Sequence, residues 1–366
     1  MNAENQINGK KTNRPPRLLV TGGGGFLGSA IVRALIRQGE SVRSFSRGFY
    51  PDLEVLGVEQ VRGNLRDAEA VESACSGVET VFHTAAKAGV WGPEHAFVAA
   101  NVGGTRNVIE ACRKRAVAQL VYTSSPSVVF DGSDMEGIDE SAPYPARYLT
   151  HYPRTKAQAE RMVRAAADDN LKTIVLRPHL IWGPGDNHLV PRIIARARRL
   201  RRVGSGRNRV DTIYIDNAAD AHLLAADALR KDASLSGRVY FISQGKPIRL
   251  WEMVNAILAA GGLPPVRGSI SPRTALCIGA VLEFCYRSLG IRAEPPMTRF
   301  VAKELATSHW FDISAARRDL GYAPRVSTEQ GLQQLAGWLQ TSRLSNDDER
   351  NGRPVQPRLD NPQRRR

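Results

Sequence analysis

The 366-residue chain lacks long apolar runs and has few cysteines. No stretch reaches the roughly 20 apolar residues that a membrane-spanning helix needs, and the polar residues 1–17 contain no apolar segment of a secretory signal. The four cysteines form no Cys-x-x-Cys pair and no spacing typical of a metal site; they are Cys75, Cys112, Cys277 and Cys285. We therefore expect buried, reduced thiols and a cytoplasmic location.

Acidic residues are scarce relative to basic ones, which gives a net charge of +15. Residues 191–209 hold eight arginines and no acidic residue. The chain has no nucleic-acid-binding motif and no aromatic residues interleaved for base stacking, so we expect no nucleic-acid partner. A solvated arginine face is the favoured interpretation of 191–209, and contact with an acidic substrate, a lipid or a protein partner is the alternative.

What the chain does contain is an alternation of strand-like and helical segments. Runs of strand-forming residues occur at 17–21, 41–47, 58–63, 79–86, 118–125 and 173–178, and helical patterns lie between most of them, at 67–75, 96–115 and 152–167. This alternation predicts βαβ units and a parallel sheet that is covered on both faces. We predict an α/β fold with a Rossmann-type doubly wound parallel sheet.

The pattern changes after residue 178. One more strand is predicted at 239–245, and helices are predicted at about 250–260, 274–289 and 328–340. This order predicts a smaller, mainly helical C-terminal lobe at 179–340, interleaved with the last strands of the sheet domain at 17–178. The polar segment 1–16 and the basic, Pro-rich segment 341–366 are expected to be disordered tails.

Segment 274–289 is the most apolar stretch of the lobe, and it carries Glu283 and Arg287. It is too short to span a bilayer. We favour a core or pocket-lining helix, and a helix that lies on a membrane surface is the alternative.

A glycine-rich loop, TGGGGFLG at 21–28, stands between the first strand and a helical pattern that ends at Gly39. Gly22 permits a tight turn, Gly25 lets the backbone approach a pyrophosphate, and Gly28 lets the helix pack closely on the strand. The helix N-terminus directs free N–H groups at the phosphates. The loop predicts dinucleotide binding by the sheet domain, and a purely structural turn is the alternative.

The end of the second strand indicates which dinucleotide binds. An acidic residue there would hold the ribose of NAD, but this strand ends in Ser46, followed by Arg47. No carboxylate repels a 2′-phosphate, and a guanidinium can pair with one. We predict a preference for NADP(H), with NAD(H) as the alternative cofactor and a solvated turn residue as the alternative interpretation of Arg47.

Tyr152 and Lys156 stand four residues apart, which puts them on one face of a helix. A nearby ammonium lowers the pKa of a phenol from about 10 toward a working acid–base range. Tyr144 and Tyr148 are rival tyrosines, but neither has a lysine four residues on. Pro153 predicts a helix that begins at about Tyr152. The tripeptide TSS at a strand end offers a hydroxyl for a substrate carbonyl.

These motifs occur in order with others: TGxxGxxG, HTAA, NVGGT, YTSS, Tyr-x-x-x-Lys and LRPHLIWGPGD. In this combination the chain resembles the extended short-chain dehydrogenases/reductases over about residues 17–340. YTSSPSVVF, YIDNAADAH and DLGYAPRVSTEQGL resemble the 3β-hydroxysteroid dehydrogenase-like branch. Within it, AAKAGVWGP and LIWGPGDNHLVPRIIARAR are most similar to the 2-alkyl-3-oxoalkanoate reductases of bacterial olefin biosynthesis.

The resemblance implies roles for particular residues. Tyr152 would be the general acid in reduction or the base in oxidation, and Lys156 would hold the ribose hydroxyls and tune Tyr152. Ser125 would polarise the carbonyl, with Ser124 as the alternative. The remaining cofactor contacts would come from Gly22, Gly25, Phe26 and Gly28 at the pyrophosphate, Asn64 near the adenine, Ala85 and Ala86, and Pro178 near the nicotinamide.

Two further polar residues are interpreted as structural, and two histidines, His179 and His188, lie by the pocket-forming loop. We expect His83 to be a hydrogen-bonded group at a strand end and Asn101 to form hydrogen bonds at a helix start. His179 and His188 form no metal constellation, so no metal is expected.

The resemblance implies an NAD(P)-dependent oxidoreductase that interconverts 3-oxo and 3-hydroxy groups on a bulky apolar substrate. The first choice is reduction of a 2-alkyl-3-oxoalkanoate to the 3-hydroxy acid. The alternatives are a 3β-hydroxysteroid or sterol-4α-carboxylate 3-dehydrogenase and, in another class, a non-catalytic NADP-sensing protein. Trp91 and Trp182 are candidates to line the substrate pocket, with core packing as the alternative. Peripheral membrane contact and a homodimer are left open.

Overall fold

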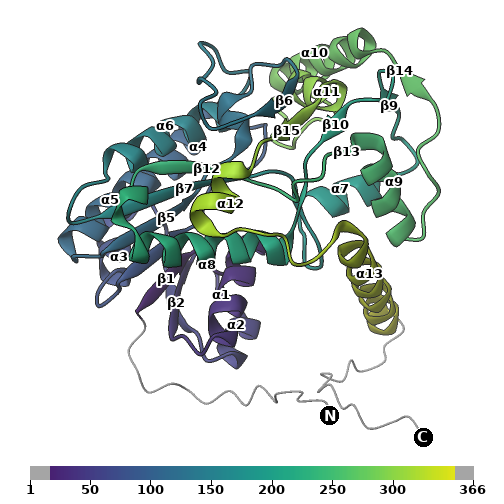
Figure 1. Cartoon of the computed structure of the whole chain (residues 1–366). Coiled ribbons are helices and arrows are strands. Elements are labelled where there is room, and N and C mark those ends of the chain that lie inside the picture. The colour runs from purple at the N-terminus through teal and green to yellow at the C-terminus, as the bar shows by residue number, and fades with distance from the viewer. Residues whose placement is uncertain (1–16, 351–366) are drawn as a thin grey trace, which may run out of the picture.

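Seven parallel strands form the central sheet of the protein (Figure 1). We describe a computed structural model that covers residues 17–350, with side chains described to residue 341. The strand order is β12-β7-β5-β4-β1-β2-β3, and every pairing is parallel. The strands are β1 (Leu18–Thr21), β2 (Val42–Ser46), β3 (Glu59–Arg62), β4 (Thr80–His83), β5 (Gln119–Thr123), β7 (Lys172–Pro178) and β12 (Arg238–Ile242). The predicted Rossmann-type sheet is confirmed.

Helices cover both faces of this sheet (Figure 1). One face packs against α1 (Phe26–Arg37), α8 (Ile215–Lys231) and α12 (Ser314–Leu320), and the other packs against α3 (Ala68–Ala74), α5 (Gly104–Lys114) and α6 (His151–Ala165). Successive strand residues enter different cores: Val20 packs on the α1 side and Leu19 on the α5 side. Burial on both faces explains why inner strands such as β1 (LLVT) and β5 (QLVYT) are rich in apolar residues, whereas the edge strand β3 (EQVR) has no buried residue.

The C-terminal portion is mainly helical, as predicted, and three of its short strands join β6, from residues 135–138, in a second, four-stranded sheet. Its helices are α7 (Leu189–Arg196), α9 (Leu250–Ala260), α10 (Pro272–Ser288), α11 (Arg299–Ala306) and α13 (Thr328–Arg350). The second sheet has the order β13-β10-β15-β6 and consists of β13 (Ile248–Arg249), β10 (Arg209–Val210), β15 (His309–Phe311) and β6 (Met135–Ile138). The remaining short α-helices and strands are α2 (Pro51–Val55), α4 (Glu94–Phe97), β8 (Ile181–Trp182), β9 (Arg202–Val203), β11 (Ile213–Tyr214) and β14 (Ser269–Ile270). A π-helical turn, η1 (Val98–Gly103), and two 3-10 turns, η2 (Pro126–Val129) and η3 (Ala233–Leu235), complete the fold.

Some element boundaries differ from the predictions. Helix α6 begins at His151 with Thr150 as its N-cap, so Pro153 is the third helical residue rather than the first. The first four N–H groups of a helix have no intrahelical acceptor, so proline is tolerated throughout this turn. Helix α13 continues through Arg350, past residue 341, where the C-terminal tail was predicted to begin. Predicted tail residues 1–16 and 351–366 lie outside the described residues.

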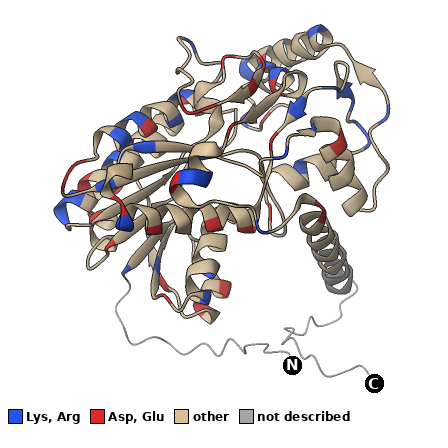
Figure 2. Ribbon diagram, in the orientation of Figure 1, with Lys and Arg blue, Asp and Glu red and all other residues tan. Residues whose placement is uncertain are grey.

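The arginines of 191–209 lie on α7, β9, β10 and the turns that connect these elements, and most of them are exposed, as the solvated-face interpretation expects. In Figure 2, blue stretches of the ribbon mark the basic residues along this part of the chain. Two of them are anchored: Arg192 pairs with Glu294 at 2.8 Å, and Arg196 donates to the Pro296 carbonyl at 3.0 Å.

Helix α10 is the pocket-lining helix and not the core helix of the two favoured interpretations of segment 274–289, because Glu283, Tyr286 and Arg287 line a cavity while few of its residues are buried. Its buried residues are Ala275, Gly279 and Glu283. A Cβ at Gly279 would lie 2.7 Å from backbone atoms at the start of α11, so this glycine lets the two helices touch. The opposite face is exposed and apolar. It also carries Cys277, which is an exposed thiol and not a buried one as expected.

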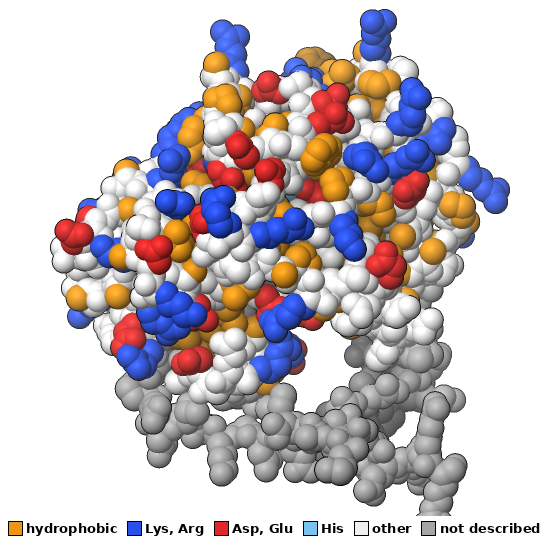
Figure 3. Space-filling view, in the orientation of Figure 1, with side chains coloured by type: hydrophobic (Ala, Val, Ile, Leu, Met, Phe, Trp, Pro, Cys, Tyr) orange, Lys and Arg blue, Asp and Glu red, His pale blue; other side chains and the backbone are white. Residues whose placement is uncertain are grey.

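Large apolar side chains project from α10 and the segment that follows it: Ile278, Val281, Phe284, Leu289 and Ile291. Phe284 and Leu289 are 72% and 73% exposed. In Figure 3, hydrophobic and basic side chains both reach the surface at the top of the view, where Figure 1 places α10. Within residues 17–350, no helix is long and apolar enough to cross a membrane.

Candidate active site

The carboxyl ends of the parallel strands meet along one edge of the sheet, and the predicted cofactor residues follow these ends. Their order across the sheet is Pro178 (β7), Ser125 (β5), Ala85 and Ala86 (β4), the glycine loop (β1), Arg47 (β2) and Asn64 (β3). Open parallel sheets bind dinucleotides at this edge. Residues spread over more than 150 positions of sequence thus share one side of the molecule.

The glycine loop is built from backbone contacts that exclude side chains. Gly22 leaves β1 with a φ of +74°, which favours glycine, and a Cβ there would lie 3.0 Å from the Ala85 backbone. A Cβ at Gly28 would lie 2.0 Å from the Gly22 carbonyl oxygen, so α1 packs directly on the turn. Gly25 is the N-cap of α1, and Phe26 is its first residue. The tight turn expected at Gly22 and the close packing expected at Gly28 are therefore confirmed.

Gly24 is not one of the glycines of the G-x-x-G-x-x-G spacing, but it too has no room for a side chain. A Cβ there would lie 2.0 Å from the Tyr50 ring, so this tyrosine packs flush on the loop. The Gly24 N–H donates to the Ser46 hydroxyl at 3.2 Å. The end of β2 therefore touches the loop directly, through a short side chain where an acidic residue would stand in an NAD site.

Two arginines lie at the ends of the neighbouring strands β2 and β3. Arg47 is exposed, and within residues 17–350 its side chain has no hydrogen bond or ion pair. Ser46 pairs with Arg62 in the parallel register, which puts both side chains on the face of the sheet that carries the glycine loop. Arg62 is exposed too and was not predicted. Asn64 follows in the next turn, where its side-chain oxygen accepts from the Arg66 N–H at 3.1 Å.

His83 and Asn101 are buried polar residues whose hydrogen bonds hold the segments around the site in place. Both His83 ring nitrogens are hydrogen-bonded, to Thr21 at 2.7 Å and to Thr105 at 3.0 Å, as the structural interpretation expects. Burial, with the Lys156 charge, lowers the pKa of His83 to about 3, so the ring is neutral. Asn101 is not at a helix start: it lies inside a π-helical turn between α4 and α5.

The Asn101 side chain is the link between that π-helical turn and two other segments. It accepts from the Lys87 N–H at 2.7 Å, donates to the Lys87 carbonyl at 3.2 Å and donates to Thr155 on α6 at 3.1 Å. The extra residue of a π turn aims this amide inward, and such turns are frequent at functional sites. Asn101 thereby fixes the loop after β4 relative to α6.

Ser125, Tyr152 and Pro178 line one cavity of about 270 Å³, which we call the inner cavity. It is bounded by the loop after β4, the ends of β5 and β7, and helices α6, α7 and α11. The structure thus brings together the tyrosine, the serine and the strand-end proline that the sequence had suggested from three separate motifs. Tyr144 and Tyr148 do not line it.

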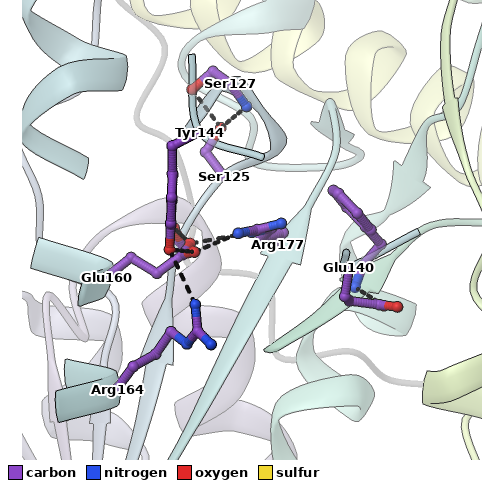
Figure 4. Close-up of polar contacts among 9 residues, drawn as sticks. Ser125, Ser127, Glu140, Tyr144, Glu160, Arg164 and Arg177 are labelled. Carbon is purple, nitrogen blue, oxygen red and sulfur yellow. Dashed lines mark hydrogen bonds and ion pairs between the residues drawn. The ribbon is translucent and has the colours of Figure 1, made fainter. Parts of the chain in front are cut away.

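Ser124 and Ser125 point in different directions. Ser124 is buried and donates to Glu160 at 2.5 Å, so its hydroxyl is committed to the interior. Ser125 lies 2.9 Å from the Ser127 hydroxyl and accepts from the Ser127 N–H, at the cavity wall (Figure 4). Figure 4 also shows Tyr144 directed at Glu160, to which it donates at 2.7 Å.

The sequence predicted that the Lys156 ammonium lowers the pKa of Tyr152, but in the structure this ammonium binds other groups. Its ammonium donates to the Thr123 carbonyl at 2.5 Å and lies 4.2 Å from the centre of the Tyr122 ring. Burial lowers the pKa of Lys156 to about 7, against the opposing effect of the Glu160 charge. Burial also raises the pKa of Tyr152 to about 12; the Ser125 hydroxyl opposes this shift, and the Lys156 charge does not contribute.

A second, outer cavity of about 1170 Å³ adjoins the inner one, and Val90 lines both. Trp91 lines this outer cavity, where its indole N–H donates to the Ile291 carbonyl at 3.3 Å. Trp182 lines neither. It is fully buried, donates to the Thr212 hydroxyl at 3.1 Å and packs edge-on against Tyr214, so its assignment to the substrate pocket was wrong.

Several residues of the inner cavity were not predicted. Ser127, His188, Arg192, Phe300, Glu304 and His309 all line it. His188 and Arg192 follow the WGPGDN turn, and the turn itself was the available signal. Glu304 and His309 come from α11 and β15, more than 140 residues beyond Tyr152, and no motif marks them. Within residues 17–350, no group of three or more His, Cys, Asp or Glu side chains is arranged to hold a metal ion.

The sheet order, the glycine loop and the strand-end residues define a dinucleotide-binding fold. A solved structure with this fold is "MoeE5 in complex with UDP-glucose and NAD", with a TM-score of 0.68, 26% identity, and coverage of 89% of this chain and 99% of that one.

Residues 19–269 match the 3-beta hydroxysteroid dehydrogenase/isomerase family, and the chain belongs to that family. It is 52% identical to the 2-alkyl-3-oxoalkanoate reductase of Stenotrophomonas maltophilia over 87% of this chain and 98% of the relative. It is 50% identical to the protein of the same name from Shewanella oneidensis over 87% and 85%. The predicted class, an NAD(P)-dependent oxidoreductase of the 3β-hydroxysteroid dehydrogenase-like branch, is confirmed.

Proposed function

We propose that the chain reduces 2-alkyl-3-oxoalkanoates to the 3-hydroxy acids with NADPH. The observation that carries this proposal is the inner cavity, in which Ser125 and Tyr152 face one space at the end of β7, on the sheet edge that also carries the glycine loop. The similarity to two proteins named 2-alkyl-3-oxoalkanoate reductase supports the substrate class. The outer cavity has room for alkyl chains that the inner cavity of about 270 Å³ cannot hold.

The residues of the sheet edge fit a nicotinamide dinucleotide. The glycine loop leaves no space for side chains between α1 and Ala85, so its backbone N–H groups can meet a pyrophosphate. Phe26 and Ala86 would flank the cofactor, and Lys156 would hold its ribose hydroxyls. When bound, the cofactor supplies the hydride.

The chain's own residues then handle the proton and the carbonyl. Ser125 donates a hydrogen bond to the 3-oxo oxygen and polarises it, while its own oxygen accepts from the Ser127 N–H. Tyr152 gives its proton to the oxygen as the alcohol forms. The raised pKa of Tyr152 keeps the phenol protonated at neutral pH, which suits reduction.

We propose that NADPH is preferred because of the strand ends at β2 and β3. Ser46 leaves no carboxylate beside the glycine loop. Arg47 has no partner within residues 17–350, and Arg62 lies on the same face as Ser46. Two unpaired guanidinium groups at that edge can bind a 2′-phosphate, with Asn64 nearer the adenine.

Turnover with a panel of substrates tests the proposed function. NADPH oxidation is followed with 2-alkyl-3-oxo acids and with 3-oxosteroids, and the products are identified by mass. We expect 3-hydroxy acids from the oxo acids. Turnover of steroids alone would favour the second candidate, a 3β-hydroxysteroid or sterol-4α-carboxylate 3-dehydrogenase, which the family model supports. Cofactor binding without any turnover would favour an NADP-sensing protein.

We also propose that the exposed face of α10 rests on an anionic lipid surface. Arg273 and Arg287 are exposed on this helix, and its acidic residue Glu283 is buried and paired with Arg299, so the face is apolar and positive. The same segment lines the outer cavity through Tyr286 and Ile291. An apolar substrate could thus enter from the lipid.

Sedimentation with vesicles of phosphatidylglycerol and phosphatidylcholine tests this contact. We expect the protein to bind the anionic vesicles and the Val281→Ser, Phe284→Ser variant to bind at least about tenfold more weakly. Val55→Ser, at an 82% exposed apolar site on α2, is the matched control and should not change binding. Unchanged binding by the double variant contradicts the proposal. Loss of a dimer in that variant would instead assign this face to a second copy of the chain.

A further inference from the structure

Glu304 is an acidic side chain of α11 that lines the inner cavity beside Ser125 and Tyr152. Among the side chains that the structure describes, those of residues 17–341, its carboxyl group has no hydrogen bond or ion pair. Its negative charge would be felt at Tyr152, where it acts to raise the pKa of the phenol. The reaction steps above leave this group without a role.

A chain of hydrogen bonds holds Glu304 in place. His309 Nε2 lies 2.9 Å from the Glu304 backbone carbonyl, which can only accept, so this nitrogen carries the proton. His309 Nδ1 must then accept from His179 Nε2 at 2.8 Å. Burial lowers the pKa of both histidines, so the chain is neutral. The last turn of α11 is thereby fastened to β15 and to the end of β7.

The geometry of the substrate brings its acid group to this wall. In a 3-oxo acid the carboxyl carbon is two bonds from the reacting carbon. A ketone held by Ser125 and Tyr152 therefore places the carboxylate inside the same cavity of about 270 Å³. The other ionisable groups that line this cavity are His179, His188, Arg192 and His309. Of these, Arg192 carries a permanent charge, and it is held by Glu294 at 2.8 Å.

We propose that Glu304, as a neutral carboxylic acid, donates a hydrogen bond to the substrate carboxylate beside the reacting ketone, and that Arg192 supplies the counter-charge. This pair would select 3-oxo acids over neutral 3-oxo compounds. The proposal rests on the proposed function and names the group that recognises the acid.

The protonation state of Glu304 agrees with this role. Burial raises the pKa of Glu304 to about 8, so at neutral pH the group is protonated and can donate. Above pH 8 it becomes an anion and repels the substrate carboxylate. The KM for the acid should therefore rise with pH, while a neutral analogue should show no such rise.

The oxidative direction gives the cleanest test, because 3-oxo acids lose carbon dioxide spontaneously and the 3-hydroxy acids do not. A 2-alkyl-3-hydroxyalkanoic acid and its methyl ester are oxidised with NADP⁺. The C3 hydride goes to the nicotinamide, and the hydroxyl proton goes to the small phenolate fraction of Tyr152, which grows with pH equally for both compounds. KM is measured from pH 7 to pH 9 for the wild type, Glu304→Gln and Glu304→Leu. Glu252→Gln, at an exposed glutamate of α9, is the control.

We expect the wild-type KM for the acid to rise about tenfold between pH 7 and pH 9, as a group with this pKa ionises. Glu304→Gln keeps a donor and cannot ionise, so its KM should stay flat. Glu304→Leu should raise the KM for the acid about tenfold at every pH and leave the ester unchanged.

A pH profile of Glu304→Gln that matches the wild type, or equal effects on acid and ester, would overturn this inference alone. The dependence of KM on pH in Glu304→Gln tests the inference even if Glu304→Leu does not fold. Failure of the wild type to oxidise either compound would overturn the proposed function and this inference with it.

Discussion

Replacing Glu160 by glutamine should destabilise the protein strongly, because Glu160 balances a buried arginine beneath the active site. Glu160 lies on α6, one turn after Lys156, and its side chain is 0% exposed. It accepts from Arg177 at 2.5 Å and 3.1 Å, from Ser124 at 2.5 Å and from Tyr144 at 2.7 Å (Figure 4). The Arg177 side chain is only 2% exposed.

The magnitude follows from the burial of both charges. Removing one partner of a buried ion pair leaves the other charge without compensation and costs about 3–5 kcal/mol. Glu160→Gln keeps the size of the side chain, so this cost comes from the charge and not from a cavity. Adding Arg177→Met removes the stranded charge, and the double variant should recover part of the loss.

The pH dependence has a defined sign. Burial acts to raise the pKa of Glu160, but Arg177 and the two hydroxyl donors outweigh it, and the pKa is lowered in the folded state. The stabilisation is therefore present above the unfolded pKa of about 4.3 and is lost as the pH falls through the folded pKa. Glu160→Gln should lack this part of the acid sensitivity.

Denaturant unfolding at pH 7 and pH 4, followed by tryptophan fluorescence, measures both effects. A Glu160→Gln midpoint that corresponds to less than about 1 kcal/mol of destabilisation at pH 7 would refute the reasoning. A double variant that is less stable than Glu160→Gln alone would show that the arginine is not the stranded charge.

Three further variants test separate parts of the structure. Arg47→Ala should weaken NADPH binding about tenfold or more and leave NADH binding unchanged, as measured by fluorescence titration; equal losses would contradict a 2′-phosphate contact. Gly24→Ala should abolish cofactor binding or unfold the loop, because the new Cβ would lie 2.0 Å from the ring of a tyrosine. Gly337→Ala on α13 is the control: its Cβ meets nothing within 4 Å, so it should raise the free energy of unfolding by up to about 1 kcal/mol. Trp182→Ala should lower the free energy of unfolding by about 3–5 kcal/mol, because Trp182 is a core residue. Trp91→Ala should raise KM with little effect on unfolding, because Trp91 lines the outer cavity. The reverse pattern would make Trp91 the core residue and Trp182 the cavity residue.

The central sheet could be predicted because its strands are buried on both faces and alternate with helices. The strands at 17–21, 118–125 and 173–178 lie within one or two residues of β1, β5 and β7. The short strands of the second sheet, such as Arg209–Val210, could not be predicted. Two residues carry no periodic pattern, and their pairing depends on distant chain segments.

The candidate site was predictable where one short motif carries the chemistry and unpredictable where the lobe completes the cavity. Ser125, Tyr152 and the glycine loop are each part of such a motif. Glu304 reaches the cavity only because α11 folds over the end of β7, and nothing near it in the sequence reports that contact. The prediction that Trp182 lines the substrate pocket was wrong for a related reason, because an aromatic residue near a strand end can equally face a cavity or the core. The tuning of the Tyr152 pKa by Lys156 stays a prediction, because helical spacing fixes a shared face and does not fix a contact.

The behaviour of Tyr152→Phe tests the account most directly. Phenylalanine keeps the ring that lines the inner cavity and removes only the proton that the reaction needs. The account predicts NADPH binding within about twofold of the wild type and loss of nearly all turnover of a 2-alkyl-3-oxo acid, at least about a hundredfold. Turnover by Tyr152→Phe equal to that of the wild type would contradict the assignment of the inner cavity as the active site.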